Sequence, residues 1–311
     1  MSSPSVLVIG GNGFMGRKLL PCLHGRASRI TALGRSPVLA KEAVPGVAYV
    51  RGDFGDADVL MPLLDRHDII VHLAYATVPN TSFDDPLADL LQNLPPVVGL
   101  FTEIAARKKK LLLVSSGGTV YGEGLTLPIT EDQPPRPISP YGVTKLTLEN
   151  YAHLYAVTHG LQFVSVRPSN AYGPGQRPFV GQGFIATAMA SAMRGQPVRI
   201  FGDRGAIRDY IYITDLTEGI AQLLTQGELS QAYNVGSRQG RSNMDVIEAM
   251  TPMLRESGHA LQVEHLPERP FDVKANVLDA RKIQALTGWK PEISFEQGLR
   301  LTYAWLKNKG F

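Results

Sequence analysis

Near the N-terminus stands the stretch Val6-Leu-Val-Ile-Gly10-Gly-Asn-Gly13-Phe-Met-Gly16, an apolar run followed at once by glycines at the spacing G-x-x-G-x-x-G. The run predicts a buried strand, and Phe14 to His24 has a helical pattern. Glycines at such a junction permit a tight turn and let backbone N–H groups approach a pyrophosphate at the N-terminus of the helix. Because the motif lies between a strand and a helix, it predicts a dinucleotide-binding loop over a simple glycine-rich turn.

Short apolar runs alternate with helical segments through the first half of the chain. The expected strands are Arg29–Leu33, Val47–Val50, Ile69–Leu73, Leu111–Val114 and Phe163–Val166. Helices are expected over 60–64, 84–107 and 139–159, and Pro95 and Pro96 should start a new helix or kink the second of these. Continuous apolar strands separated by helices indicate a parallel sheet covered on both faces. Right-handed crossovers then predict an α/β fold with a Rossmann-type doubly wound parallel sheet.

The pattern changes near Tyr172, where Gly and Pro become frequent and longer helical segments follow. We therefore expect residues 1–171 to form a dinucleotide-binding domain. Residues 172–311 are expected to form a smaller α/β substrate-binding lobe at the carboxyl edge of the sheet. Some segments of the chain are expected to be exchanged between the two parts.

Composition restricts the kinds of partner. The 311 residues carry a formal net charge of +3, which is too weakly basic to indicate nucleic acid but suits an anionic substrate. The one cysteine, Cys22, excludes an intrachain disulfide and is typical of a reducing compartment. No signal peptide and no apolar run of about 20 residues is visible. We expect a cytoplasmic protein with no membrane segment, no nucleic-acid partner and no metal site.

The residues after the second expected strand bear on the choice of cofactor. NAD-binding proteins usually place Asp or Glu there for the ribose hydroxyls, whereas this chain has Gly34-Arg35-Ser36. A guanidinium suits a 2′-phosphate, so NADP is favoured and NAD stays possible. Arg35 could otherwise stack on the adenine or point to water. Asp53, after the third strand, is placed to hold the adenine amino group or to form a turn.

Tyr141 and Lys145 are four residues apart in an expected helix, which puts both on one face. A phenol is a poor base at neutral pH because its ordinary pKa is about 10. A neighbouring ammonium and a cationic nicotinamide favour the phenolate and lower that pKa. Tyr141 is therefore the candidate proton shuttle for a sugar hydroxyl during hydride transfer, and Lys145 can also hold the nicotinamide ribose.

Further motifs occur in a consistent order along almost the whole chain. They are the glycine loop, Gly52-Asp53, His72–Ala74, Asn93, Ser115–Gly122, Pro140–Lys145, Arg167–Pro174, Arg208–Ile211, Asp215, Tyr233–Gly236, Arg269–Asp272 and Gly288–Pro291. Together they resemble the extended short-chain dehydrogenases/reductases that modify nucleotide sugars, the NAD(P)-dependent epimerases, dehydratases and 4-ketoreductases, and among them the UDP-glucose 4-epimerases. The resemblance implies a nucleotide-sugar substrate. It also implies a homodimer formed through two helices per subunit, one of which carries Tyr141.

The resemblance implies roles for individual residues as well. The implied cofactor-binding residues, beside Arg35 and Ser36, are Gly10, Gly13, Phe14, Met15, Gly16, Asp53, Phe54, Leu73, Ala74, Tyr75, Asn93, Tyr141, Lys145 and Ser169. Asn170 would bind a phosphate of the sugar nucleotide, and Asp272 the nucleoside ribose. Arg208 and Arg269 would clamp the diphosphate, since two guanidinium groups suit a dianion.

Two neighbouring positions depart from the family pattern. Gly117 stands where epimerases have a catalytic Ser or Thr, so Ser116, Thr119 or a water is expected to supply the hydroxyl. Gly118 and Thr119 stand where 4,6-dehydratases have an Asp–Glu pair. The chain therefore has no acid–base pair there to eliminate the 6-hydroxyl, which argues against a dehydratase.

These observations lead to one hypothesis and two rivals. The first is a nucleotide-sugar 4-epimerase that acts on a UDP-hexose or a UDP-N-acetylhexosamine through a 4-keto intermediate. Asn276 falls where epimerases gate the 2-substituent of the sugar, and Asn is smaller than the Tyr that blocks an N-acetyl group. The alternative is an NADPH-dependent nucleotide 4-keto-sugar reductase, supported by Arg35 and Gly117. An NADP-sensing binding protein on the same fold is disfavoured by the Tyr141–Lys145 pair.

Overall fold

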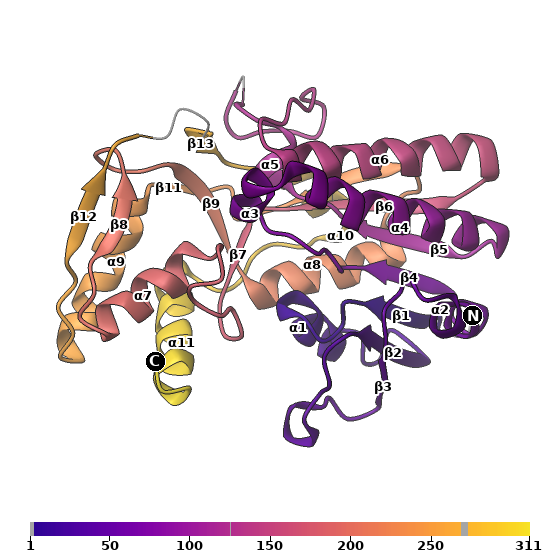
Figure 1. Cartoon of the computed structure of the whole chain (residues 1–311), viewed down its shortest axis with the longest axis horizontal. Coiled ribbons are helices and arrows are strands. Elements are labelled where there is room, and N and C mark those ends of the chain that lie inside the picture. The colour runs from indigo at the N-terminus through magenta and orange to yellow at the C-terminus, as the bar shows by residue number, and fades with distance from the viewer. Residues whose placement is uncertain (1–2, 125, 269–272) are drawn as a thin grey trace.

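Seven parallel strands form the central sheet of the computed structural model, which describes residues 3–124, 126–268 and 273–311 (Figure 1). The strands are β1 Ser5–Ile9, β2 Arg29–Gly34, β3 Val47–Arg51, β4 Ile69–His72, β5 Lys110–Val114, β6 Gln162–Pro168 and β10 Gln231–Val235. Their order across the sheet is β10-β6-β5-β4-β1-β2-β3. The order reverses between β1 and β4, where a doubly wound sheet leaves a crevice at the carboxyl ends of its strands.

Helices cover both faces of this sheet. They are α1 Phe14–Cys22, α2 Ala57–Asp65, α3 Pro79–Asp84, α4 Pro86–Ala106, α5 Gly117–Val120, α6 Pro140–His159, α8 Ile213–Gln226 and α10 Arg281–Thr287, with a 3-10 turn at Ala40–Glu42. Val6 and Val8 of β1 pack in one core with α1 and α8, whereas Leu7 and Ile9 pack in another with α2, α4 and α6. Because apolar residues are buried on both sides of the strand, its sequence is continuously apolar and does not alternate.

A smaller lobe lies beyond the carboxyl ends of the sheet, at the left of Figure 1. Its strands are β7 Asn170–Tyr172, β8 Val198–Phe201, β9 Ile207–Tyr212, β11 Gly240–Arg241, β12 Val263–Leu266 and β13 Ala275–Asn276, and its helices are α7 Phe184–Met193, α9 Asn243–Glu256 and α11 Phe295–Asn308. β9 pairs with β7, β11 and β13, and β8 pairs with β12. The expected fold class, a Rossmann-type doubly wound sheet with a smaller C-terminal lobe, is confirmed.

One strand of the central sheet comes from the second half of the chain. β10 pairs in parallel with β6, with Tyr233 opposite Val166, although it lies well beyond residue 171. The helix before it, α8, packs against α1, and the Arg26–Glu218 ion pair at 2.5 Å joins α8 to the turn that follows α1. Sequence analysis did not identify the strand at β10. The division of the chain at residues 171 and 172 stays a prediction about its folding units.

Helix α4 continues through Pro95 and Pro96, so the expectation that these prolines start a new helix is wrong. The helix begins at Pro86, where the Asp85 side chain accepts the N–H of Ala88 at 2.9 Å. The two prolines remove backbone donors from its middle. The residues that follow them on the same helix, Val97, Leu100, Phe101 and Ile104, are buried against the sheet. This packing stabilises the helix where its own hydrogen bonds are missing.

A buried ion pair connects α6 to the sheet. Arg167 on β6 and Glu149 on α6 are each 8% exposed in their side chains and meet at 2.6 Å. Arg167 also donates to the hydroxyl of Tyr121 at 2.8 Å, and that hydroxyl donates to Asn234 of β10 at 2.8 Å. The network therefore joins β6, β10 and the helix that carries Tyr141.

Removing the charge of Glu149 should destabilise the protein, because Arg167 would keep a buried charge without its partner. We expect Glu149→Gln to lower the free energy of unfolding by about 3 kcal/mol, measured by urea denaturation. The control is Glu264→Gln, which breaks the exposed Arg199–Glu264 pair at 2.8 Å and should cost less than about 1 kcal/mol. Equal losses in the two variants would contradict this assignment.

Candidate functional site

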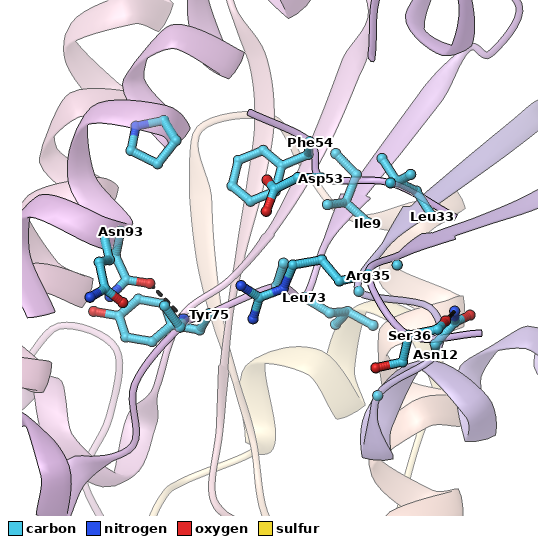
Figure 2. Close-up of a pocket in the computed structure, with 18 residues that line it drawn as sticks. Ile9, Asn12, Leu33, Arg35, Ser36, Asp53, Phe54, Leu73, Tyr75 and Asn93 are labelled. Carbon is cyan, nitrogen blue, oxygen red and sulfur yellow. Dashed lines mark hydrogen bonds between the residues drawn. The ribbon is translucent and has the colours of Figure 1, made fainter. Parts of the chain in front are cut away.

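Two neighbouring pockets lie at the carboxyl ends of the strands. The predicted cofactor residues that line the first pocket are Gly10, Gly13, Arg35, Ser36, Asp53, Phe54, Leu73, Ala74, Tyr75 and Asn93 (Figure 2). The predicted residues that line the second are Phe14, Met15, Ser116, Thr119, Tyr141, Ser169, Asn170 and Arg208. Gly16 and Lys145 are buried behind these walls. The structure thus brings most of the predicted site together around one continuous region of the sheet edge.

The glycine loop forms a turn too tight for side chains. Gly10 has a φ of 86°, and a Cβ there would lie 2.8 Å from the backbone nitrogen of Ala74. A Cβ on Gly16 would lie 2.5 Å from the carbonyl oxygen of Gly10. Helix α1 starts directly after the loop, and no side chain caps it at Gly13. The N–H groups of its first turn are therefore available to an anion, which fits the pyrophosphate of a dinucleotide.

The end of β2 presents a cation and hydroxyl to the first pocket. Arg35 and Ser36 are both exposed and line the pocket, and Asn12 donates to the carbonyl of Ser36 at 2.6 Å. Across the pocket, the Oδ1 atom of Asp53 accepts the N–H of Gly55 at 2.9 Å. Asp53 therefore forms a turn and lines the pocket at the same time, so both sequence interpretations of it are compatible.

Asn93 supports the wall of the first pocket from helix α4. Its Oδ1 accepts the N–H of Ala76 at 2.8 Å, and its Nδ2 donates to the carbonyl of Asp89 at 2.7 Å. Figure 2 shows Asn93 next to Tyr75, which precedes Ala76 in the loop after β4. The amide therefore holds the loop that carries Tyr75.

Tyr141 and Lys145 lie on α6, which begins at Pro140 and is capped by the Ser139 side chain, which accepts the N–H of Gly142 at 3.1 Å. Lys145 is 5% exposed. Its Nζ donates to the carbonyl of Val114 at 3.0 Å and lies 4.0 Å above the ring of Tyr75. Burial lowers the pKa of Lys145 to about 7, although the carboxylates of Glu149 and Asp89 oppose the effect.

In this structure the pKa of Tyr141 is raised, whereas the sequence analysis expected Lys145 and a cationic nicotinamide together to lower it. Burial raises the pKa of Tyr141, and the nearby carboxylate of Asp89 raises it further. The Lys145 ammonium is 5.7 Å from the centre of the Tyr141 ring and lies closer to Tyr75, whose ring packs edge-on against Tyr141 at 4.8 Å. The sequence spacing placed Tyr141 and Lys145 on one face of the helix. It could not show that the ring of Tyr75 packs against both of them.

Several hydroxyl groups around the second pocket are buried and have no hydrogen-bond partner in the described part of the chain. They belong to Ser115, Thr119 and Ser169. A buried hydroxyl without a partner is costly, so these groups are suited to a ligand or to water. Ser116 and Thr119, the two residues predicted to replace the hydroxyl missing at Gly117, both line the pocket. Only the Thr119 hydroxyl belongs to this buried set.

Comparison with known proteins identifies the family. Residues 6–236 match the family described as "NAD dependent epimerase/dehydratase family". The chain belongs to the NAD-dependent epimerase/dehydratase family. It is therefore an enzyme of that family, as the motifs predicted, and its fold is that of the nucleotide-sugar enzymes.

The similar proteins include a 4,6-dehydratase and 4-epimerases. A dTDP-glucose 4,6-dehydratase of Xanthomonas campestris pv. campestris (strain B100) is 30% identical over 96% of this chain and 92% of its own length. A UDP-glucose 4-epimerase of Mycolicibacterium smegmatis is 30% identical over 97% of this chain and 98% of its own. The solved structure of a Thermus thermophilus UDP-glucose 4-epimerase in complex with NAD has 32% identity and a TM-score of 0.87, covering 97% of this chain and 99% of that one.

Gly117 is closely surrounded by its neighbours. A Cβ on Gly117 would lie 2.4 Å from Cδ1 of Leu278 and 2.9 Å from the carbonyl oxygen of Arg167. Leu278 is fully buried. The space that a Ser or Thr side chain would need is therefore occupied.

Asn276 is buried next to Gly117. It is 1% exposed, and its Nδ2 donates to the carbonyl of Gly117 at 3.0 Å. It lies beneath the backbone at Gly117 and is not part of the second pocket's wall. This burial does not favour a role for Asn276 in gating the 2-substituent of the sugar, and that role stays a prediction. Gapless counting from a distant motif could not place the residue, because its environment depends on how β13 pairs with β9.

Arg208 lines the second pocket, whereas Arg269 and Asp272 lie outside the described residues. Sequence analysis missed several residues on the pocket wall, among them Gln176, Phe179, Arg199, Phe201 and Asn243. They come from a loop, from strand β8 and from the start of helix α9 in the small lobe, and belong to no motif that could have indicated them. Phe179 has a φ of 61° and stacks under Arg194 at 4.8 Å.

The described residues contain neither a metal-binding cluster nor a membrane-spanning helix. In the ranges 3–124, 126–268 and 273–311, no group of three or more His, Cys, Asp or Glu is arranged to hold a metal ion. Within the same ranges, no helix has the length and apolar content needed to cross a membrane.

Restoring the family's hydroxyl at position 117 should damage this enzyme. We expect Gly117→Ser to lower the free energy of unfolding by about 1–3 kcal/mol, because the side chain would collide with Leu278 in a packed core. The control is Gly99→Ser, since nothing lies within 4 Å of a Cβ at that position. Thermal unfolding of both variants checks the prediction, and a Gly117→Ser protein as stable as the control would contradict it.

Proposed function

We propose that this enzyme is an NAD(P)-dependent nucleotide-sugar 4-epimerase that acts on a UDP-hexose or a UDP-N-acetylhexosamine through a 4-keto intermediate. The observation that carries the proposal is the Tyr141–Lys145 pair. Tyr141 lines the second pocket together with the unpartnered Thr119 hydroxyl, and Lys145 lies against the ring of Tyr75, which lines the first pocket. A related protein that matches along its whole length is a UDP-glucose 4-epimerase. The cationic side chain of Arg208 in the second pocket suits the diphosphate of such a substrate.

The first pocket fits a dinucleotide, because the uncapped start of α1 and the glycine turn leave backbone N–H groups for its pyrophosphate. The chemistry that a bound nicotinamide supplies is reversible hydride transfer at C4 of the sugar. With a cationic nicotinamide bound nearby, which favours the phenolate, Tyr141 Oη would take the proton of the 4-hydroxyl during oxidation and give it back during reduction. Thr119 would donate a hydrogen bond to the same oxygen. The protein therefore ends the cycle in its starting protonation state, as an isomerisation requires.

A dehydratase activity is disfavoured, although one similar protein is a dTDP-glucose 4,6-dehydratase. Elimination at C5 and C6 needs an acid and a base beside the sugar. The resemblance leads us to expect this acid and base at positions 118 and 119. Those positions hold Gly118 and Thr119, which have no carboxyl group. The alternative function is an NADPH-dependent 4-keto-sugar reductase, favoured by Arg35 in the first pocket and by the absent side chain at Gly117.

The assembly and location are proposed on the same basis. Leu87, Leu90 and Leu91 on α4 and Val143, Leu154 and Val157 on α6 are exposed. Helices α4 and α6 pack against each other, so these side chains extend over neighbouring helices. A homodimer formed through α4 and α6 would cover them. We propose a homodimer in the cytoplasm.

The purified protein should contain tightly bound nicotinamide dinucleotide and should convert UDP-glucose or UDP-N-acetylglucosamine to its C4 epimer, followed by NMR of the sugar. Tyr141→Phe should lower kcat roughly 100- to 10,000-fold, because the proton shuttle is lost. The control is Tyr155→Phe on the same helix, whose hydroxyl is bonded to Thr102 at 3.0 Å. No epimer with any UDP-sugar, together with stoichiometric NADPH oxidation by a 4-keto sugar, would make the enzyme a reductase.

We also propose that NADP binds more tightly than NAD, since Arg35 stands where a carboxylate would select NAD. Arg35→Ala should weaken NADP about tenfold, the loss of one charge-assisted contact, and leave NAD nearly unchanged. Calorimetric titration with both dinucleotides measures the change, and Arg66→Ala, an exposed arginine elsewhere on the surface, is the control. An equal loss for both dinucleotides would show that Arg35 does not read the 2′-phosphate.

A further inference from the structure

One buried acid near the Tyr141–Lys145 pair has no part in the mechanism above. Asp89 lies in the first turn of α4 and is 0% exposed. Its Oδ1 accepts a hydrogen bond from the hydroxyl of Thr77, and its Oδ2 accepts one from the hydroxyl of Thr144 at 2.7 Å. Each carboxylate oxygen therefore has a neutral donor, as a fully buried carboxylate requires.

These two hydrogen bonds connect Asp89 to helix α6, which carries Tyr141 and Lys145, and to the loop after β4, which carries Tyr75. Thr144 lies on α6 directly before Lys145, and Thr77 follows Tyr75 by two residues in the loop after β4. One turn further along α4, Asn93 holds the same loop through the N–H of Ala76, as Figure 2 shows. Asp89 thus fixes α6 and the Tyr75 loop to a single turn of α4.

Charge gives Asp89 a second connection to Lys145. The acid on the same helix as the lysine, Glu149, is already paired with Arg167 through three hydrogen bonds at 3.1, 3.1 and 2.6 Å. The Asp89 carboxylate accepts its hydrogen bonds from the neutral hydroxyl groups of two threonines, which do not balance its charge in this way. A buried carboxylate near a buried ammonium favours the charged form of the lysine.

The other titratable groups that face Lys145 do not supply that charge. Burial lowers the pKa of His72 to about 3, so this imidazole is neutral. Burial, with Asp89 and Tyr141 as further causes, raises the pKa of Tyr75, which is therefore a neutral phenol beneath the ammonium. Tyr141 is likewise a neutral phenol at neutral pH, because burial and Asp89 raise its pKa.

We propose that Asp89 is a positioning residue for the Tyr141–Lys145 pair, anchoring α6 through Thr144 and balancing the buried positive charge of Lys145. The negative charge of Asp89 favours the protonated form of both Lys145 and Tyr141, and its removal makes each group easier to deprotonate. The pKa values of the two groups then fall together. The part of the inference that is tested by enzyme activity rests on the proposed function. The protonation of Lys145 can be measured without any substrate.

The test compares the wild-type protein with Asp89→Asn, a variant of the same size without the charge. NMR of protein carrying ¹³C-labelled lysine follows the Lys145 Cε signal, assigned by its loss in Lys145→Arg, between pH 5 and 9. We expect the midpoint in Asp89→Asn to fall by about one pH unit, the effect of removing one nearby charge. Both the acid limb and the alkaline limb of the kcat/KM profile should also move to lower pH. The matched control is Asp215→Asn, another buried carboxylate, which accepts the N–H of Ile293 at 3.0 Å and should leave the midpoint and both limbs in place.

The possible results separate the inference from the proposed function. A folded Asp89→Asn protein with an unchanged Lys145 midpoint would overturn the inference, whatever its activity. A lowered midpoint in a protein that epimerises no UDP-sugar would support the inference and count against the proposed function. A uniform fall in activity, without movement of midpoint or limbs, would indicate a purely structural residue and would overturn the electrostatic role.

A second variant decides the question if Asp89→Asn does not fold. Thr144→Val keeps the carboxylate and removes its anchor to α6. We expect a several-fold lower kcat with KM little changed, because the Tyr141–Lys145 pair loses its alignment with the reacting sugar. Wild-type kcat together with a wild-type Lys145 midpoint would overturn the inference.

Discussion

The backbone of Gly10 and that of Gly16 approach so closely that a Cβ on the second would lie 2.5 Å from the carbonyl oxygen of the first. This approach starts helix α1 directly at the carboxyl end of β1 and turns the N–H groups of its first turn to the dinucleotide pocket. It also sets the place of α1 against α8, the helix that leads into the last strand of the sheet. Cofactor binding and the joining of the two halves of the chain thus depend on the same turn.

Buried charges lie close together around Lys145, and burial strengthens the electrostatic effect that they have on one another. Lys145 is held by a backbone carbonyl and an aromatic face, with acids on α4 and α6 at its periphery. In such surroundings the ammonium is close to losing its proton, so small changes in nearby charge alter its state. A bound dinucleotide brings further charge to the same place. Burial and Asp89 therefore favour Tyr141 as a phenol, and a change in nearby charge shifts the balance between phenol and phenolate.

Sequence analysis predicted the parts of the site that depend on local spacing. The glycine loop, the Tyr141–Lys145 spacing and the residues after each strand were found because parallel strands bring their carboxyl ends to one edge. It could not place Asn276, whose surroundings depend on the pairing of β13 with β9, or give the direction of the Tyr141 pKa shift in this structure, which depends on burial and on Asp89. It also missed Asp89 itself. An aspartate in the first turn of a helix is typical of a favourable helix terminus, and no spacing connects it with residues on another helix.

Local patterns were sufficient for the α/β fold, the family, the glycine loop after β1 and the placing of Tyr141 and Lys145 on one helix. These features follow from strand and helix periodicity and from residues a few positions apart, which chain geometry places together in any such fold. The occupied space around Gly117, the return of β10 to the central sheet and the neighbours of Lys145 required the folded chain. Each of them joins residues far apart in sequence, for example Gly117 with Leu278 and Thr144 with Asp89. Contacts of that kind depend on how side chains fill the space between packed elements, and single-chain spacing carries no information about that packing.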